Sequence, residues 1–146
     1  MKRSQRIKTI VDIKQTQEQK ALEELGGAQR RRQDMQNKLQ DLQQYREEYQ
    51  QQYMALGNNG VSINRLLDFR AFVSKLDKAI AEQQVRLQQI DHELQRKRQS
   101  WEQAHYKTRS LQKVHDRVLR SESMELARQE QKDQDENASR GGRKVP

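Results

Sequence analysis

The sequence predicts an all-α protein, a long antiparallel coiled-coil hairpin of two helices. In two runs, the residues at alternating steps of four and three are mostly apolar, ten of fourteen in the first run and twelve of sixteen in the second. A repeat of 3.5 residues places each run on one narrow stripe of a helix, here called the seam, which only another such stripe can bury. The first run is Ile7, Val11, Lys14, Glu18, Ala21, Leu25, Ala28, Arg32, Met35, Leu39, Leu42, Arg46, Tyr49 and Tyr53. The second run is Leu66, Phe69, Val73, Leu76, Ile80, Gln83, Leu87, Ile90, Leu94, Lys97, Trp101, Ala104, Thr108, Leu111, His115 and Val118.

The composition also favours long helices over a rounded core. Only 32% of the 146 residues are hydrophobic, 34% are charged, and the mean hydropathy is -1.31. The 24 glutamines are good helix formers, and proline, the strongest helix breaker, occurs only at Pro146. A disordered chain would share this polarity but would not keep a heptad register over so many repeats.

Glycines mark the end of the first helix. This helix is expected to begin near Ser4 and to end near Leu56, with the turn at residues 57–61. Gly57 can adopt the left-handed conformation that ends a helix. Gly26-Gly27 interrupts the same helix, and each glycine costs about 1 kcal/mol relative to alanine. The pair is either a tolerated weak spot or a hinge that lets the open end of the hairpin adapt to a partner.

The second helix has its own start signal. Ser62 is the expected N-cap, and Val61 can pack on Leu66 as a hydrophobic staple. The start of this helix is therefore specified locally.

The two arms of the hairpin are unequal in length. Folding about the turn places Ile7 opposite the region of Gln112, and the chain beyond Leu119 has no opposite helix. The hairpin is expected to occupy residues 1–130. Residues 131–146 show no hydrophobic period and are expected to form a disordered polar tail.

The sequence lacks the residues that several classes of function require. Without cysteine there are no disulfides, thiolate metal sites or cysteine nucleophiles. His92, His105 and His115 do not have the spacing of a metal site. Neither a glycine-rich phosphate loop nor an enclosed cavity that could shift a catalytic pKa is predicted. We therefore expect no enzyme, no metal and no cofactor.

Charge and hydropathy bound the partners and the location. The N-terminus lacks the apolar stretch of a secretory signal, and no segment approaches the roughly 20 apolar residues of a membrane span, so a cytoplasmic protein is expected. The net charge is +8, divided as +3 from residues 1–60 and +5 from residues 61–146. Such a surface favours an acidic protein, a lipid headgroup surface or nucleic acid.

Two basic clusters, Arg30-Arg31-Arg32 and Arg96-Lys97-Arg98, allow three interpretations. The second cluster is expected opposite Glu23 and Glu24, which favours solvated faces with ion pairs over a protein-docking patch. Nucleic-acid binding is disfavoured because no aromatic stacking residues are interleaved with the arginines.

Tyr45 and Phe72 lie beside the seam near the turn, and mirror pairing places them nearly opposite each other. They form either an exposed patch that binds a partner or extra packing within the hairpin. Trp101 lies on the seam and is expected in the core. The patch is expected to contain Leu42, Tyr45, Tyr49, Phe72, Leu76 and Ala79.

At these residues the sequence resembles the FliJ family of flagellar export proteins. The similar stretch runs from about Leu39 to Leu111, and the spacing of the patch residues around the Gly57-Asn58-Asn59-Gly60 turn carries the resemblance. FliJ proteins are cytoplasmic components of the flagellar type III export apparatus. They form an antiparallel coiled coil similar to the central stalk of rotary ATPases.

The resemblance implies three kinds of partner. The open end of the hairpin would enter the ring of the hexameric export ATPase FliI, the patch near the turn would bind the cytoplasmic linker of the export gate FlhA, and the protein would handle export chaperones. Lys38 and Gln83 beside the patch depart from the residues usual there. The expected ring contacts are Ile7, Val11, Leu25, Arg30, Arg31, Arg32, Leu111 and Val118. The alternative is a generic basic coiled-coil scaffold, associated with nucleic acid, that needs no ATPase.

Overall fold

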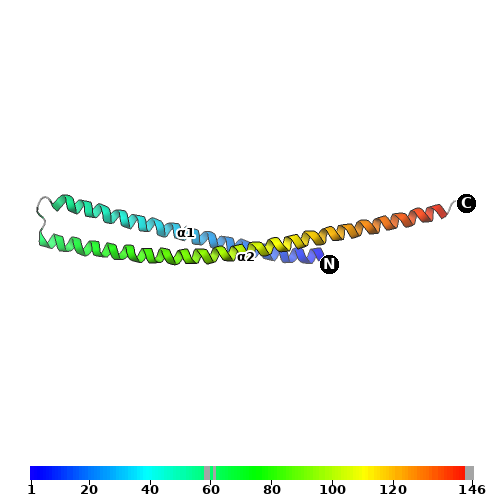
Figure 1. Cartoon of the computed structure of the whole chain (residues 1–146), viewed down its shortest axis with the longest axis horizontal. Coiled ribbons are helices and arrows are strands. Elements are labelled where there is room, and N and C mark those ends of the chain that lie inside the picture. The colour runs from blue at the N-terminus through cyan, green and yellow to red at the C-terminus, as the bar shows by residue number, and fades with distance from the viewer. Residues whose placement is uncertain (58–59, 61, 144–146) are drawn as a thin grey trace. The chain divides into compact units, whose positions relative to one another are not determined.

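The computed structural model describes residues 1–57, 60 and 62–143, which form two long helices (Figure 1). Helix α1 spans Arg3–Gly57, and helix α2 spans Ile63–Arg143. The described residues contain no strand. The all-α prediction is confirmed, and the predicted bounds of α1 agree with the observed ones to within one residue.

The start of α2 follows the prediction, whereas the conformation of Gly57 at the end of α1 differs from it. The hydroxyl of Ser62 accepts a hydrogen bond from the backbone N–H of Arg65 at 3.3 Å, as an N-cap does. Gly57 is the last helical residue and does not take a positive φ; Gly60 does, with φ of 77°. A left-handed residue is therefore needed within the turn rather than at the helix end. The predicted staple of Val61 and the turn positions Asn58 and Asn59 lie outside the described residues.

The seam is confirmed at every position. All fourteen residues of the first run and all sixteen of the second are buried or half-buried, including the charged and polar members. The 3.5-residue period therefore identifies inward positions whatever the polarity of the residues that occupy them. The buried apolar side chains are Val11, Leu25, Ala28, Leu39, Leu76 and Ile90.

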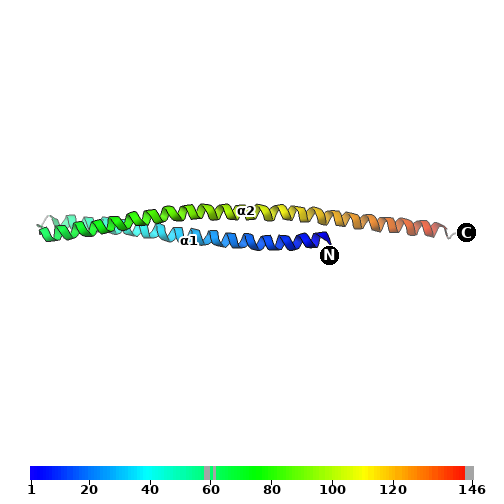
Figure 2. The same ribbon diagram turned by 90° about the horizontal axis from the view of Figure 1, so that it is seen from below.

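The chain divides into two compact units, of which one comprises residues 21–101. Within it, the α1 and α2 segments run antiparallel, because Glu24 pairs with Lys97, Arg31 with Glu93 and Arg46 with Asp77. Figure 2 shows these segments from below. At the seam, the buried Gln83 side chain donates a hydrogen bond of 3.1 Å to the backbone carbonyl of Met35. Without this bond, burial of the Gln83 amide group would reduce the free energy of unfolding.

The other unit comprises residues 1–20 and 102–146. Glu18 lies 2.6 Å from His105, and Glu122 accepts two hydrogen bonds from Ser4, from its backbone N–H at 3.0 Å and its hydroxyl at 2.6 Å. The predicted pairing places Ser4 opposite the region of His115, so the paired part of α2 extends about two turns farther than expected.

The predicted disordered tail is wrong over most of its length. Residues 131–143 continue α2, and those whose side chains are described are exposed. Their glutamines, lysine, arginines and glutamate are good helix formers, and the Gln131 amide donates to Asp135 one turn later at 3.1 Å. The missing hydrophobic period shows that this segment packs on nothing within the described chain; it does not prevent a helix.

Alanine at Gly26 and Gly27 should stabilise α1. A Cβ atom at these positions would lie 3.9 and 3.7 Å from the guanidinium ends of Arg30 and Arg31, which is ordinary van der Waals contact. The double substitution should therefore raise the free energy of unfolding by roughly 2 kcal/mol, seen as a higher melting temperature by circular dichroism. Gly60→Ala is the opposing control, since its positive φ makes alanine unfavourable. An unchanged melting temperature would show that the glycines do not weaken the helix.

The contact between Ser4 and Glu122 should make stability depend on pH. The side-chain hydrogen bond from Ser4, then its backbone hydrogen bond, lowers the pKa of Glu122, with further help from Lys2 and His115. Because the pKa is lower in the folded state, the contact stabilises the fold above the unfolded-state pKa and is lost as the pH falls through the folded-state value. The carboxylate also lies at the N-terminus of α1, where negative charge is favourable.

Glu122→Gln should therefore lower the melting temperature at neutral pH. The difference from the wild type should vanish in acid below the folded-state pKa, when Glu122 is protonated in both states. Melting curves of both proteins across this range give the result. Glu125→Gln, at an exposed residue three positions farther along α2, is the matched control. If the difference in melting temperature stayed constant with pH, the charge on Glu122 would not contribute to stability.

Candidate partner-binding surfaces

Five aromatic side chains pack together near the turn of the unit formed by residues 21–101. Tyr53 and Phe69 stack with ring centroids 3.8 Å apart, and Tyr49 lies between the two helices, 5.4 Å from Phe69 and 4.5 Å from Phe72. Tyr45 meets Phe72 edge to face at 6.0 Å. We call Tyr45, Tyr49, Tyr53, Phe69 and Phe72 the aromatic cluster. Its rings come from both helices and replace the aliphatic seam at this end.

The cluster bears on the two interpretations of Tyr45 and Phe72. The two rings are in contact across the hairpin, as the mirror pairing predicts. Phe72 is half-buried against Tyr49, whereas Tyr45 is 50% exposed. Phe72 therefore contributes to packing within the hairpin, and Tyr45 presents a ring to solvent while contacting Tyr49 and Phe72.

The remaining predicted patch residues lie deeper. Leu42, Tyr49 and Ala79 are half-buried, and Leu76 is only 7% exposed. Leu76 is thus a core residue that supports the patch from below. A partner docking here would contact Tyr45 first and the half-buried side chains at its edge.

Sequence reasoning missed the part of the cluster closest to the turn. Tyr53 and Phe69 border a shallow hollow of about 320 Å³, whose other lining residues include Leu56 and the charged Arg65 and Asp68. The signal was present in the tyrosines at 45, 49 and 53, which recur every four residues and so lie along one face of α1.

The apolar residues predicted to contact the ATPase ring lie in the seam. Val11 and Leu25 are 3% and 7% exposed, and Ile7, Leu111 and Val118 are half-buried. While the helices stay paired, these side chains face the opposite helix. They hold the fold together and offer little surface to a partner.

The arginines of the first basic cluster divide into paired and unpaired residues. Arg31 donates to Glu93 at 2.8 Å and Arg32 donates to Asp91, whereas Arg30 is exposed and makes no ion pair within the described chain. Of the second cluster, Lys97 pairs with Glu24 at 3.2 Å, as predicted. Ion pairing across the hairpin thus involves Arg31, Arg32 and Lys97, and each such exposed pair contributes at most about 1 kcal/mol.

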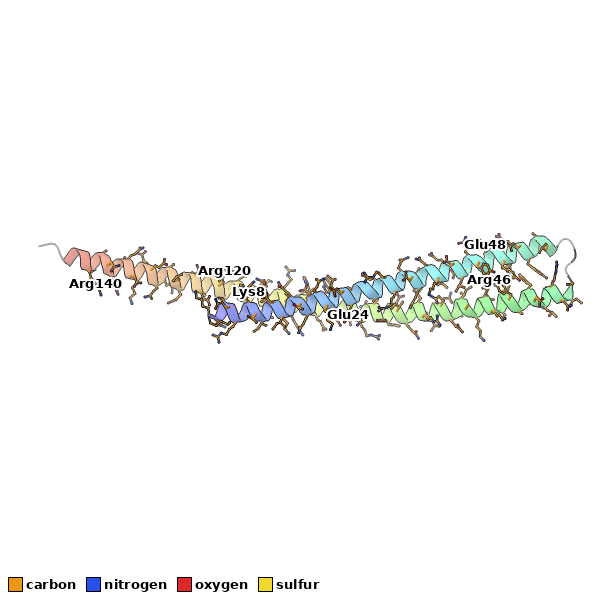
Figure 3. The ribbon with its side chains drawn as sticks, turned by 180° about the vertical axis from the view of Figure 1, so that it is seen from behind. Lys8, Glu24, Arg46, Glu48, Arg120 and Arg140 are labelled. Carbon is orange, nitrogen blue, oxygen red and sulfur yellow. The ribbon has the colours of Figure 1, made fainter. Side chains whose placement is uncertain are left out.

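Figure 3 shows how the charged side chains follow the helices. Arg46 lies on the side of α1 that faces α2, where it pairs with Asp77, and Glu48 lies on the far side. Across residues 1–57, 60 and 62–143, no three histidine or acidic side chains gather as metal ligands would. Neither helix has, within its described residues, an apolar stretch long enough to cross a membrane.

Comparison with known proteins identifies the family of this chain. The family model described as flagellar FliJ protein matches residues 2–145. The chain belongs to the flagellar FliJ family. It is 26% identical over 140 residues to the flagellar FliJ protein of Salmonella typhi, covering 96% of this chain and 95% of that protein. It is 25% identical over 138 residues to the flagellar FliJ protein of Escherichia coli (strain K12), covering 94% of each. No solved structure gave a significant match.

Proposed function

We propose that this FliJ family member acts in flagellar type III protein export, as a cytoplasmic adaptor between the hexameric export ATPase FliI and the cytoplasmic part of the export gate FlhA. The unit of residues 21–101 would bind the gate through the aromatic cluster. The unit of residues 1–20 and 102–146 would bind the ATPase ring. Export chaperones would bind the same adaptor.

The exposed ring of Tyr45 is the observation that carries the gate assignment. A half-exposed tyrosine that packs against two other aromatic rings matches the anchors that dominate protein interfaces, because little conformational entropy is lost on binding. Membership of the flagellar family supplies the setting, and the resemblance of the patch residues supplies the partner.

The adaptor would stimulate its ATPase without supplying a catalytic group. Its described side chains offer no phosphate cradle, and its exposed helices offer no enclosed site for a general base. Stimulation would then come from preferential binding to the assembled ring or to one of its conformations. The effect should be largest at ATPase concentrations where the ring is only partly assembled.

Binding assays test the adaptor role directly. The purified full chain should bind both the export ATPase and the cytoplasmic part of the gate, and it should raise ATP hydrolysis. The proposal would be refuted if the chain failed to bind the ATPase or failed to bind the gate. Binding to nucleic acid that persists at physiological salt, with neither protein bound, would favour the scaffold alternative, because purely electrostatic binding to phosphates weakens steeply with salt.

A further inference from the structure

The whole net charge of the chain comes from two short stretches. Residues 1–11 and 107–121 contain nine lysines and arginines and a single acidic residue, Asp116, and nine minus one equals the +8 of the entire protein. The rest of the chain therefore carries equal numbers of basic and acidic residues. The basic residues are Lys2, Arg3, Arg6, Lys8, Lys107, Arg109, Lys113, Arg117 and Arg120.

The fold places these two stretches in the same unit. The contacts of Ser4 with Glu122 and of Glu18 with His105 align the start of α1 with this part of α2. Figure 3 shows Lys8 and Arg120 on these stretches of the two helices. One unit thus concentrates positive charge that is far apart in the sequence.

The heptad register places four of these nine residues on one flank of the seam and two on the other, whereas Lys2, Lys113 and Arg120 occupy the heptad position farthest from the seam. Arg31 and Glu93, which are in contact across the hairpin, each directly precede a seam residue. Ile10 and Val114 lie three heptads from Arg31 and Glu93, in opposite chain directions, and so occupy the equivalent facing positions. Arg3 and Lys107 share that flank one heptad away. The heptad position three residues farther along each helix adjoins this flank on the side away from the seam. It is occupied by Arg6, Ile13 and Arg117.

The face defined by these residues has an apolar centre and a basic border. Ile10, Ile13 and Val114 are 46%, 53% and 39% exposed. No aspartate or glutamate occupies the same two heptad positions between residues 3 and 20 or between 103 and 128. We call this surface the basic face; its residues are Arg3, Arg6, Ile10, Ile13, Lys107, Val114 and Arg117.

The opposite face of the unit is mixed in charge. It carries Lys8 and Arg109, but also Asp12, Glu102 and Asp116. The basic side chains of the basic face make no ion pair within the described part of the chain, so their charges remain available to a partner.

We propose that the basic face is the surface by which this unit docks into a groove lined by carboxylates on the export ATPase, an inference that rests on the proposed function. An apolar centre bordered by arginines is the usual anatomy of a protein interface, and arginine binds carboxylates in a bidentate manner. A lipid surface is a poorer fit, because interfacial helices insert tryptophan, phenylalanine or leucine, and the basic face carries none of these residues.

Charge reversal on the two faces tests this docking surface. Arg6→Glu with Arg117→Glu changes the basic face, and Lys8→Glu with Arg109→Glu changes the opposite face by the same net charge. Each full-length variant is titrated with the export ATPase at several salt concentrations, and melting curves confirm folding. The basic-face pair should lose at least tenfold in affinity and show a weaker salt dependence, whereas the control pair should lose no more than about threefold.

The outcomes separate the docking surface from the adaptor role. If the wild type binds the ATPase and both pairs lose affinity equally, the basic face is refuted and the adaptor role stands. If the wild type does not bind the ATPase, both are refuted. A second measurement uses vesicles with and without phosphatidylglycerol. If the basic-face pair abolishes vesicle binding and leaves ATPase affinity unchanged, the face binds lipid and the protein partner is wrong.

Discussion

Tyr45→Ala should weaken binding to the export gate at least thirtyfold while leaving the hairpin intact. The ring is half-exposed and touches the fold mainly through Tyr49 and Phe72, so its removal takes little from the core. Truncating an aromatic anchor at an interface commonly costs about 2 kcal/mol or more, which corresponds to this loss of affinity. Titration with the cytoplasmic part of the gate gives the binding constant, and circular dichroism gives the melting temperature.

Tyr106→Ala is the matched control for this substitution. Tyr106 is 67% exposed and belongs to the other unit, so its loss should affect neither stability nor gate binding. Phe72→Ala should reduce both, because this ring packs 4.5 Å from Tyr49. If Tyr45→Ala lowers the melting temperature as much as Phe72→Ala does, Tyr45 is a packing residue and the gate surface must lie elsewhere.

The seam shows which part of the fold a sequence alone can specify. Its period identified Lys14, Arg32 and Arg46 as inward positions although all three are charged, and the structure leaves each of them half-buried. Burial in a two-helix hairpin follows from register, since only one stripe of each helix can face the other. Long aliphatic stems let lysine and arginine occupy such positions while their charged groups reach solvent or a partner.

Features that depend on longer-range geometry were less predictable. The pairing of Ser4 with Glu122 depends on the relative shift of the two helices, which a mirror rule about the turn does not give. The assignment of disorder beyond residue 130 failed because lack of packing was equated with lack of helix. The basic face escaped notice because its residues become neighbours only when the two helices pair.

For the candidate sites too, the sequence predicted some features and not others. The spacing of Tyr45 and Phe72 about the turn predicted their contact. The predicted ring contacts were chosen for their apolar character, and that character also places Val11 and Leu25 in the core. In a thin hairpin, apolar seam residues are needed for folding, so a docking surface must be sought on the flanks.

Ile90→Asp should destabilise the hairpin more than any exposed substitution. Ile90 is 4% exposed and is one of the few buried apolar side chains of the seam. A carboxylate there loses the apolar contacts and also meets a poorly solvated site, for a combined cost of several kcal/mol in the free energy of unfolding. A marginally stable domain has about 5 to 15 kcal/mol in total, so a large fall in melting temperature is expected.

Ile63→Asp supplies the same chemical change at an exposed site. Ile63 is 77% exposed and is the first residue of α2, where a negative charge favours the helix. The melting temperature of the Ile63→Asp variant should therefore equal that of the wild type or exceed it slightly in the same circular dichroism experiment. Equal losses from both substitutions would mean that burial in the seam does not govern stability, and the paired-helix architecture would have to be abandoned.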